Sequence, residues 1–560
     1  MAEPVSYARS RFTSIHANHS YSSKAQGEPA TMASRTADSS PLGRLLTSKW
    51  TALTLVTGLT LAYMGWPSKS LNPAVEYDPT IRVPLGRSFD TIPVRCDAHD
   101  DDKKHRMAWR ARLPAALAKF APITAEEVNA TLVKNQQSFR VDDPANRIKR
   151  QDDAVDASSL GAGAATYPSL VFRYDTNQVP SNSPIEDHHR EWVMPFVQID
   201  SNGPPSSSSN PLAQPGRWLM FGVFDGHSGY QCSRKVAHDL PLHIQRALNW
   251  TDPTDVPQPA LAPAASVLEK SEGTKRMHAL SAQQLAAIQH MQAALTTGFI
   301  TMDNELIQGS LQNFINHPDR PQEMLYPAVA GSCGLVASVD TALRQVSVAC
   351  TGDSRVVLGS LNPRTGEWTA IPLSTDQTAG NPAEVKRLLT EHPNEESTVL
   401  QRGRILGSLQ PTRAFGDARY KWPETIQAQI YPTQFPGRRA TPKYYQTPPY
   451  VTAVPEVTHH ALNQNDKFLV VASDGLYDEL SSAEVVQAVA EFWEAKMYNN
   501  AQPSPPTTSS GVVDDNAATH VIRRALGGQD HDIIGRLLAI PAPQSRRYRD
   551  DITVTVVFFS

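Results

Sequence analysis

Short apolar runs rich in β-branched residues recur along this chain, and each is bounded by glycine or aspartate. Apolar runs of this length between turn residues are typical of β-strands. Five of them predict strands: WLMFGVFDG from Trp218, GLVASVD from Gly334, QVSVACTGD from Gln345, KFLVVASDG from Lys467 and DITVTVVFF from Asp551.

A different periodicity begins after residue 280. Leu285, Ile288, Leu295 and Phe299 recur on one face at helical spacing, which predicts a helix over residues 281–300. Met291 lies beside this stripe and is expected in the core. Strands in hairpin-like succession with long helices between them predict an α+β fold, in which mainly antiparallel sheets are flanked by helices.

Polar segments set the expected domain boundaries. Residues 67–166 predict a polar linker and N-terminal extension with one helix, over residues 107–120, and dense motifs fill residues 167–560. Low-complexity sequence cannot pack into a core, so inserts of this kind are expected as surface loops of a single domain. Three such inserts are present: residues 201–216, 253–265 and 502–510.

The first 66 residues predict targeting and membrane attachment. Residues 1–49 are rich in Ser, Thr and Ala with scattered Arg and Lys, as in a targeting presequence, although their three acids are unusual in one. Residues 50–66 carry no charge and have a tryptophan at each end, which is typical of a short membrane span. A buried helix or the hydrophobic part of a targeting signal would give the same pattern.

Composition excludes several functions. The chain has 560 residues, 40% of them hydrophobic, and a net charge of −4, so it can bury a large core but gives no electrostatic reason to bind nucleic acid. The four cysteines, at positions 96, 232, 333 and 350, form no CxxC pair. A zinc site or a disulfide framework is therefore not expected, and the thiols should be free.

Aspartates stand where the predicted strands begin or end. Asp225, Asp353 and Asp474 follow apolar runs beside a glycine, Asp478 comes four residues after Asp474, and Asp550 precedes the last strand. A buried carboxylate is unfavourable unless something pairs with it, and a neighbouring glycine lets the backbone approach an ion. Any one of these could be a turn-forming Asp-Gly, but their recurrence indicates a shared cation site. Carboxylates suit Mg²⁺ or Mn²⁺.

Carboxylates that hold two divalent ions have a direct chemical use. Two ions close together can share a water, lower its pKa and bind phosphate oxygens, so that no covalent nucleophile is needed. The sequence contains no GxSxG elbow, no P-loop and no Cys-x5-Arg loop of cysteine phosphatases. Metal-dependent hydrolysis is therefore the favoured chemistry.

The motifs resemble those of the PP2C (PPM) family of metal-dependent protein serine/threonine phosphatases. Seven occur in the family order over residues 167–560: FGVFDGHSG, AGSCGLVASVD, ACTGDSR, LSTDQTAGNPAEVKRLLTEHP, GSLQPTRAFGD, VVASDGLYDEL and RDDITV. A finer likeness to the pyruvate dehydrogenase phosphatase branch rests on SNSPIEDHH, RYKWPETI, YYQTPPYVTAVPEVTHHAL, NAATHVIRRALG and RYRDDITVTVV. The resemblance implies an α-β-β-α sandwich with metals at one edge, residues 281–303 and 383–391 being covering helices.

The resemblance also implies a role for each site residue. Asp225 would bridge two Mg²⁺ or Mn²⁺ ions, with Gly226 a ligand through its carbonyl. The other ligands would be Asp474 and Asp550 at one ion, Glu186 at the second, and Asp353, Asp478 and Asp474 at a third, weaker site. Asp187 would orient the attacking, metal-bridging water. His227 would protonate the leaving serine or threonine oxygen, although a turn histidine bonded to backbone is the alternative.

Two positions depart from the wider family pattern. Most members carry a phosphate-binding arginine where this chain has Asn182, and an asparagine where it has Asp551; the pyruvate dehydrogenase phosphatase branch shares both changes. The residue that grips the phosphate is therefore left unidentified. The nearby cations His188, His189 and Arg190 could do so, but ordinary surface residues give the same pattern.

The implied function is hydrolysis of phosphoserine or phosphothreonine in a protein. The implied substrate is the E1α subunit of the mitochondrial pyruvate dehydrogenase complex, or else another mitochondrial phosphoprotein. The implied location is mitochondrial, with inner-membrane attachment through residues 50–66 on an undetermined side. Two alternatives stay open: a non-catalytic relative that only binds, and a different metallohydrolase.

Overall fold

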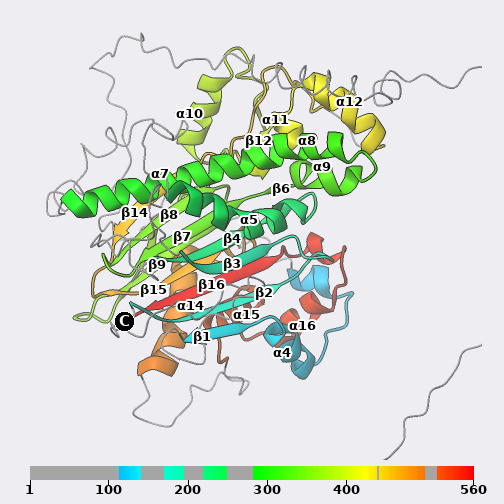
Figure 1. Ribbon diagram of the computed structural model, residues 1–560. Coiled ribbons are helices and arrows are strands. Elements are labelled where there is room, and N and C mark those ends of the chain that lie inside the picture. The colour runs from blue at the N-terminus through cyan, green and yellow to red at the C-terminus, as the bar shows by residue number, and fades with distance from the viewer. Residues whose placement is uncertain (1–112, 141–169, 195–217, 249–281, 438–440, 499–513) are drawn as a thin grey trace, which may run out of the picture. The chain divides into compact units, whose positions relative to one another are not determined.

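The computed structural model describes residues 113–140, 170–194, 218–248, 282–437, 441–498 and 514–560 (Figure 1). The predicted presequence, the predicted membrane span, most of the linker and the three low-complexity inserts lie outside these residues. Among the described residues, no helix is both long and apolar enough to cross a bilayer. The helix predicted over residues 107–120 is described only from residue 113, and residues 113–117 are helical.

Two antiparallel sheets form the centre of the fold. The six-stranded sheet has the order β1 (Gln137–Arg140), β2 (Val171–Val179), β16 (Ile552–Phe559), β15 (Asp466–Ala472), β9 (Arg355–Leu361) and β10 (Trp368–Pro372). The five-stranded sheet has the order β14 (Glu456–Ala461), β8 (Gln345–Thr351), β7 (Gly334–Asp340), β4 (Trp218–Phe224) and β3 (His188–Met194). All five strands predicted from the sequence are confirmed.

The strands alternate between two apolar environments. In β16, Val554 and Val556 pack towards the outer helices, whereas Val557 and Phe559 pack between the sheets. Successive side chains of a strand point to opposite faces, so a continuous apolar run suits a strand that is covered on both sides. These runs therefore indicate sheets buried on both faces.

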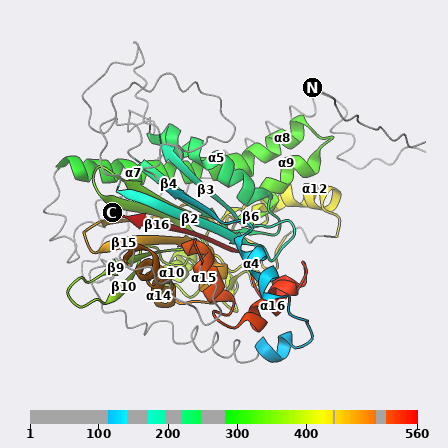
Figure 2. The same ribbon diagram turned by 90° about the horizontal axis from the view of Figure 1, so that it is seen from below.

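Helices cover the outer face of each sheet (Figures 1 and 2). α5 (Gln231–Leu248) and α7 (Ala282–Asn304) pack on the five-stranded sheet, and Met291 of α7 is buried in their shared core, as predicted. α14 (Ser482–Trp493) and α15 (Ala517–Leu526), with α4 (Ala125–Val133) and α16 (His531–Ala539), cover the six-stranded sheet. The order helix, sheet, sheet, helix confirms the predicted fold class.

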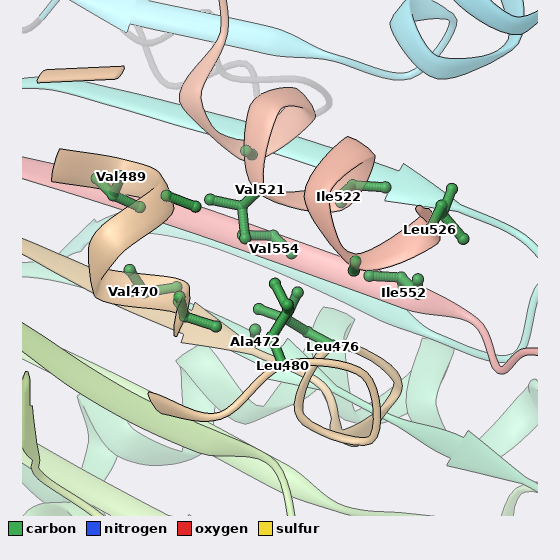
Figure 3. Close-up of a cluster of buried hydrophobic side chains, with 14 of the residues drawn as sticks. Val470, Ala472, Leu476, Leu480, Val489, Val521, Ile522, Leu526, Ile552 and Val554 are labelled. Carbon is green, nitrogen blue, oxygen red and sulfur yellow. The ribbon is translucent and has the colours of Figure 1, made fainter. Parts of the chain in front are cut away.

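The apolar layer under α15 also anchors a turn that carries aspartates. Figure 3 shows Val521 and Ile522 of α15 beside Val554 and Ile552 of β16, with Leu476 and Leu480 close to Ala472. Leu476 lies in α13 (Asp474–Tyr477), directly after β15, and is fully buried. Burying a leucine side chain contributes roughly 1.5–3 kcal/mol. The core therefore anchors α13, the helix that begins at Asp474.

A smaller apolar cluster lies outside the sandwich. It contains Leu388 of α10 (Pro382–Glu391), the helix predicted over residues 383–391, together with Tyr420 of α11 (Ala418–Lys421) and Tyr450. The other short elements are β5 (Gly226–His227), β6 (Gly331–Ser332), β11 (Leu400–Gln401), β12 (Arg404–Ile405), β13 (Phe415–Gly416), η5 (Glu305–Gly309), α8 (Ser310–Asn316), α9 (Pro321–Val329), α12 (Glu424–Gln434), η6 (Glu494–Tyr498) and η7 (Ser545–Arg547).

Candidate metal and phosphate site

The predicted site residues come from five separate places at the ends of the central strands. The loop between β2 and β3 carries Glu186 and Asp187, and Asp225 separates β4 from β5. The remaining aspartates are Asp353 after β8, Asp474 and Asp478 at the two ends of α13, and Asp550 before β16. Since neighbouring antiparallel strands end at a common edge, these segments meet although they are far apart in the sequence.

The backbone approaches closely around Gly226 and Gly475. A Cβ atom at Gly226 would lie 2.2 Å from the carbonyl oxygen of Glu186, and one at Gly475 would lie 2.0 Å from that of Asp551. Only glycine fits such contacts. The two glycines therefore allow the segments that carry Asp225 and Asp474 to pack directly against the β2–β3 loop and the start of β16.

Asp225 and Asp474 form the centre of the carboxylate cluster. Burial raises the pKa of Asp225 well above its ordinary value, and the negative charges of Asp474, Asp187 and Asp550 raise it further. Burial likewise raises the pKa of Asp474, together with the charges of Asp353, Asp478 and Asp550. Oδ1 of Asp474 is buried and has no hydrogen-bond partner. An ionised pair of this kind is unfavourable unless positive charge is added between them.

Asp353 and Asp478 both act on Asp474 through their negative charges. Burial raises the pKa of Asp353, whose Oδ1 accepts a hydrogen bond from Sγ of Cys333 at 3.1 Å. Desolvation by the surrounding residues, followed by the charges of Asp550 and Asp353, raises the pKa of Asp478 to about 7. Both groups therefore extend the cluster of unneutralised carboxylates.

Asp550 and Asp551 are adjacent but have opposite surroundings. Asp550 forms an ion pair with Arg546, and burial still keeps its pKa raised. Asp551 is buried, yet its pKa is lowered: desolvation raises it, but hydrogen bonds from the backbone of Glu186, Asn182 and Ser181 outweigh that effect. Asp550 is thus held by a half-exposed arginine, whereas Asp551 is held by backbone groups of the β2–β3 loop.

Asp551 fixes the loop that carries Glu186. Its Oδ1 accepts from the backbone N–H groups of Ser181 and Asn182 at 2.5 and 3.0 Å, and its Oδ2 accepts from that of Glu186 at 2.8 Å. The side chain of Asn182 donates to the same Oδ2 at 3.3 Å. Oγ of Ser233, on α5, donates to the Glu186 carbonyl at 2.5 Å. The position of Glu186 is therefore set by residues far from it in sequence.

Asp187, the other acidic residue of the β2–β3 loop, is buried. Oγ1 of Thr553 donates to its Oδ2 over 2.7 Å. Burial, followed by the charge of Asp551, raises the pKa of Asp187 to about 7. Asp187 is therefore more enclosed than Glu186, the other acidic residue of the β2–β3 loop.

His227 is paired with an aspartate that the sequence did not single out. Its Nε2 lies 2.7 Å from Oδ2 of Asp417, which follows β13. Burial lowers the pKa of His227, but the charge of Asp417 and its hydrogen bond outweigh burial, so the pKa is raised overall. Asp417 has a left-handed backbone with φ of 51°. A Cβ on Gly331 would lie 2.1 Å from the imidazole Nε2, so only glycine leaves room for this pair.

The donor set fits hard divalent cations in chemistry. It consists of carboxylates with raised pKa values, some of them buried, one carboxylate oxygen without a hydrogen-bond partner and a glycine carbonyl, which are the oxygen ligands that Mg²⁺ and Mn²⁺ prefer. Within the described part of the chain, however, no three His, Cys, Asp or Glu side chains are converged closely enough to hold an ion. Asp550 is turned towards Arg546 instead.

The three cations proposed near position 182 are not free surface residues. They are half-buried on β3, and each is engaged. Nδ1 of His188 lies 3.1 Å from Oγ of Ser233, and Nδ1 of His189 lies 2.8 Å from Oε1 of Glu191. Arg190 donates from Nη1 to the carbonyl of His238 over 2.7 Å. The contacts of His188 and Arg190 join β3 to α5, and the contact of His189 stays within β3.

The three described cysteines and His392 are buried in the fold. Cys232, Cys333 and Cys350 are buried and free, as predicted, and burial raises the pKa of each thiol. Buried thiols with raised pKa values are unreactive. His392, to which the sequence gave no chemistry, is buried and stacks on the ring of Tyr450 at 4.4 Å.

Sequence reasoning missed three contributors to this site: Asp417, Arg546 and the loop-fixing role of Asp551. Asp417 ends the motif GSLQPTRAFGD, and Arg546 stands four residues before Asp550. These sequence positions are the only signals for the two residues. The residues next to Asp417 do not reveal that it contacts His227, 190 residues earlier in the chain.

Comparisons with known proteins agree with this arrangement. A family model described as protein phosphatase 2C matches residues 265–524. A protein phosphatase 2C homologue of Schizosaccharomyces pombe is 41% identical over 404 residues, which are 70% of this chain and 80% of that protein. Mitochondrial pyruvate dehydrogenase (acetyl-transferring) phosphatase 1 of Saccharomyces cerevisiae is 34% identical over 427 residues, 70% of this chain and 69% of that protein. The corresponding human phosphatase 2 is 33% identical, over 70% of this chain and 79% of that protein.

Proposed function

Because this chain belongs to the protein phosphatase 2C family and is a protein serine/threonine phosphatase, we propose that it removes phosphate from phosphoserine in a mitochondrial phosphoprotein, with the carboxylate cluster as its metal-dependent active site. The observation that carries this proposal is the pair of buried Asp225 and half-buried Asp474, whose mutual repulsion a divalent cation would relieve. Its relatives include phosphatases named for pyruvate dehydrogenase and located in mitochondria.

The cluster divides into proposed ligands for two divalent ions and for a third, weaker one. Asp225, the Gly226 carbonyl, Asp474, Asp550 and Glu186 would hold the first two, and Asp353 and Asp478 would join Asp474 at the third. When bound, the ions supply charge neutralisation for the phosphate and a lowered pKa for water. The hydrogen bonds from Ser233 and to Asp551 fix the backbone of Glu186.

His227 is the proposed general acid. The departing serine oxygen needs a proton, and an imidazole near neutral pKa can deliver it. Nε2 is bonded to Asp417, so the proton for the leaving group would come from Nδ1. Asp417 would orient the ring and keep it protonated until transfer.

Asp187 is the proposed acceptor for the attacking water. Thr553 donates to its Oδ2, and because a carboxylate has several acceptor sites the group can still accept a hydrogen bond from a water beside the cluster. A carboxyl with a pKa of about 7 could take up the proton that this water releases on attack.

The catalytic proposal is tested with the full-length protein on a phosphoserine peptide. Activity should vanish in EDTA and return with Mn²⁺ or Mg²⁺, while Asp225→Asn should remain inactive with either ion. Unchanged hydrolysis by Asp225→Asn would contradict the site. The surface variant Asp319→Asn is the matched control, because its side chain is exposed and lies outside the cluster.

The proposed substrate is E1α of the pyruvate dehydrogenase complex. Two observations support it: the 33–34% identity to phosphatases with that name, and Asn182 and Asp551, which this branch shares. A shared fold does not determine the substrate, so the test combines an assay with purified components and a measurement in cells. The full chain should release phosphate from phosphorylated complex, and cells without the gene should accumulate phosphorylated E1α. Rapid release of phosphate from the purified complex, with unchanged phosphorylation of E1α in cells, would assign the enzyme to another mitochondrial phosphoprotein.

Mitochondrial targeting by residues 1–49 and attachment to the inner membrane by residues 50–66 remain predictions from sequence. An uncharged stretch flanked by tryptophans supports attachment. Deleting residues 1–66 should give an active enzyme that no longer reaches mitochondria. Release of the full-length protein by alkaline carbonate would contradict the membrane span, and protease protection of isolated mitochondria would give the side.

A further inference from the structure

The site lacks a cation at the position where the wider family pattern has its phosphate-binding arginine. The substrate phosphate carries about two negative charges at neutral pH, and the position where the family pattern has an arginine holds Asn182. The amide of Asn182 is already committed to Asp551, to which it donates at 3.3 Å. An uncharged side chain turned towards a carboxylate cannot replace an arginine at a phosphate.

Arg546 lies on the turn η7, four residues before Asp550. Its guanidinium pairs with Asp550, one of the proposed metal ligands, yet its side chain is 44% exposed. A guanidinium has five N–H donors, and one carboxylate in a monodentate pair leaves several of them free for solvent or substrate. Arg546 is thus both anchored at the cluster and accessible from outside.

The charge of Arg546 reaches the whole centre of the cluster. Its own pKa is raised by Asp550, Asp474 and Asp225 after the opposing effect of burial. On the other side, it counteracts the raised pKa values of Glu186 and Asp478. The position of Arg546 is given by its ion pair with Asp550, which places an exposed guanidinium directly at one of the proposed ligands of the cluster.

The neighbouring arginines do not share these features. Arg549 is 9% exposed and therefore buried, so a protein substrate cannot reach it. Arg547 is exposed, but in a 3₁₀ turn with three residues per turn its side chain leaves in a different direction from that of Arg546. The β3 cations His188, His189 and Arg190 are held by contacts of their own.

We propose that Arg546 binds the phosphate group of the substrate and replaces the arginine that is absent at position 182. This inference rests on the proposed function, because it concerns the phosphate in that same site. In the absence of phosphate the guanidinium rests on Asp550. When phosphate and cations are present, Asp550 would turn to the cations and Arg546 to the phosphate oxygens, so one ion pair is exchanged for two.

The test compares Arg546→Ala, Arg546→Lys and the adjacent control Arg547→Ala in the full-length protein. Inorganic phosphate is the probe: its dissociation constant is measured by calorimetry in saturating Mn²⁺, beside kcat and KM on a phosphoserine peptide. Arg546→Ala should weaken phosphate binding and raise KM by about 10- to 100-fold, the effect of losing a charged hydrogen bond. Arg546→Lys should recover part of this loss, because it keeps the charge but not the planar fork. Arg547→Ala should match the wild type.

Binding of Mn²⁺ alone, followed by electron paramagnetic resonance, separates a phosphate role from a structural one. Without Arg546, Asp550 has no competing partner, so Mn²⁺ affinity should be unchanged or higher. A phosphate dissociation constant within twofold of wild type in Arg546→Ala would overturn the proposal, as would a loss of affinity that follows weaker Mn²⁺ binding. If the wild-type enzyme does not hydrolyse the peptide at all, the proposed function fails instead, and the two failures are therefore distinguishable.

Discussion

The side-chain amide of Asn182 donates a hydrogen bond to Oδ2 of Asp551, so the two positions where this chain departs from the wider family pattern touch each other. An arginine at 182 would place its charge against Asp551, and an asparagine at 551 would offer one acceptor oxygen in place of two. The exchange of both residues thus turns a phosphate-binding position into a fastening for the loop that carries Glu186.

Replacing Asp551 with asparagine should loosen this loop. Whichever way the new amide is turned, its NH₂ group must face N–H donors, either those of Ser181 and Asn182 or that of Glu186. Leaving buried donors unpaired costs about 1–3 kcal/mol. We expect the free energy of unfolding to fall by roughly 2–3 kcal/mol in urea titrations, with a weaker affinity for Mn²⁺.

The control for this variant is Asp515→Asn, which removes an exposed carboxylate paired with Lys496. Such surface pairs contribute about 0–1 kcal/mol. Because the pKa of Asp551 is lowered in the fold, its contribution is present above the ordinary Asp pKa and is lost as the pH falls through the lowered value. The two variants should therefore converge in strong acid. Equal stability of both variants at pH 7 would show that Asp551 does not fasten the loop.

The fold could be predicted from the sequence because its signals are local. Uninterrupted apolar runs such as that of β16 mark strands buried on both faces, and the stripe containing Leu295 and Phe299 marks one face of α7. The positions of glycine next to aspartate indicated where strands end. Each of these signals is contained within about ten residues of chain.

The detailed site could not be predicted in the same way, because its partners are distant in sequence. Asp551 meets Asn182 across 369 residues, and His227 meets Asp417 across 190. The residue types at these positions are compatible with many pairings, and only the packing of β5, β6 and β13 selects one. Arg546 was overlooked for a further reason: an arginine near an aspartate in sequence is usually an ordinary surface pair.

The carboxylate cluster should destabilise the metal-free protein. Asp225 is buried, Asp474 is half-buried, and the two carboxylates repel each other, so Asp474→Asn should raise the melting temperature in EDTA. Mn²⁺ should raise the melting temperature of the wild type in a concentration-dependent way, because it binds the folded state alone, and should have little effect on the variant. Differential scanning calorimetry measures both shifts.

Asp319→Asn is the control for the melting experiment, since it removes an exposed aspartate. It should leave both the EDTA and the Mn²⁺ melting temperatures near those of the wild type. A lower melting temperature of Asp474→Asn in EDTA would mean that this carboxylate stabilises the fold, contrary to the role given to it here.

Glu384 should be a stabilising carboxylate of the cluster around α10. It is 3% exposed and accepts from Nη2 of Arg413 at 2.6 Å and from Nη2 of Arg387 at 2.8 Å. Burial raises its pKa, but the two arginines outweigh burial and lower it to about 2. Glu384→Gln leaves both guanidiniums under-neutralised, and removing one partner of a buried pair costs about 3–5 kcal/mol.

Glu391→Gln is a matched control for Glu384→Gln, because Glu391 also pairs with Arg387 but is 49% exposed on its side chain. It should change the free energy of unfolding by less than about 1 kcal/mol. The lowered pKa of Glu384 means that its contribution is complete above the ordinary Glu pKa and disappears as the pH falls towards about 2. Urea unfolding at pH 7 and pH 3 should show the difference between the variants shrinking, and a constant difference would refute the ionic origin.

The pairing of His227 with Asp417 should set the alkaline limit of activity on phosphoserine. A general acid works only while it is protonated, and Asp417 raises the pKa of His227, so activity should decline as the pH rises through that value. Asp417→Asn removes the charge, and the alkaline decline should move about 1–3 pH units lower. His227→Gln should lose about 10²- to 10⁴-fold in turnover of phosphoserine and show no such decline. With p-nitrophenyl phosphate, whose leaving group needs no proton, both variants should stay close to the wild type.

Glu305→Gln is the control for the pH profile, because it removes a half-exposed carboxylate paired with Lys235 and His243. It should leave the alkaline decline of activity where it is in the wild type. If Asp417→Asn keeps the wild-type profile, or if His227→Gln loses as much on p-nitrophenyl phosphate as on phosphoserine, His227 does not donate the proton.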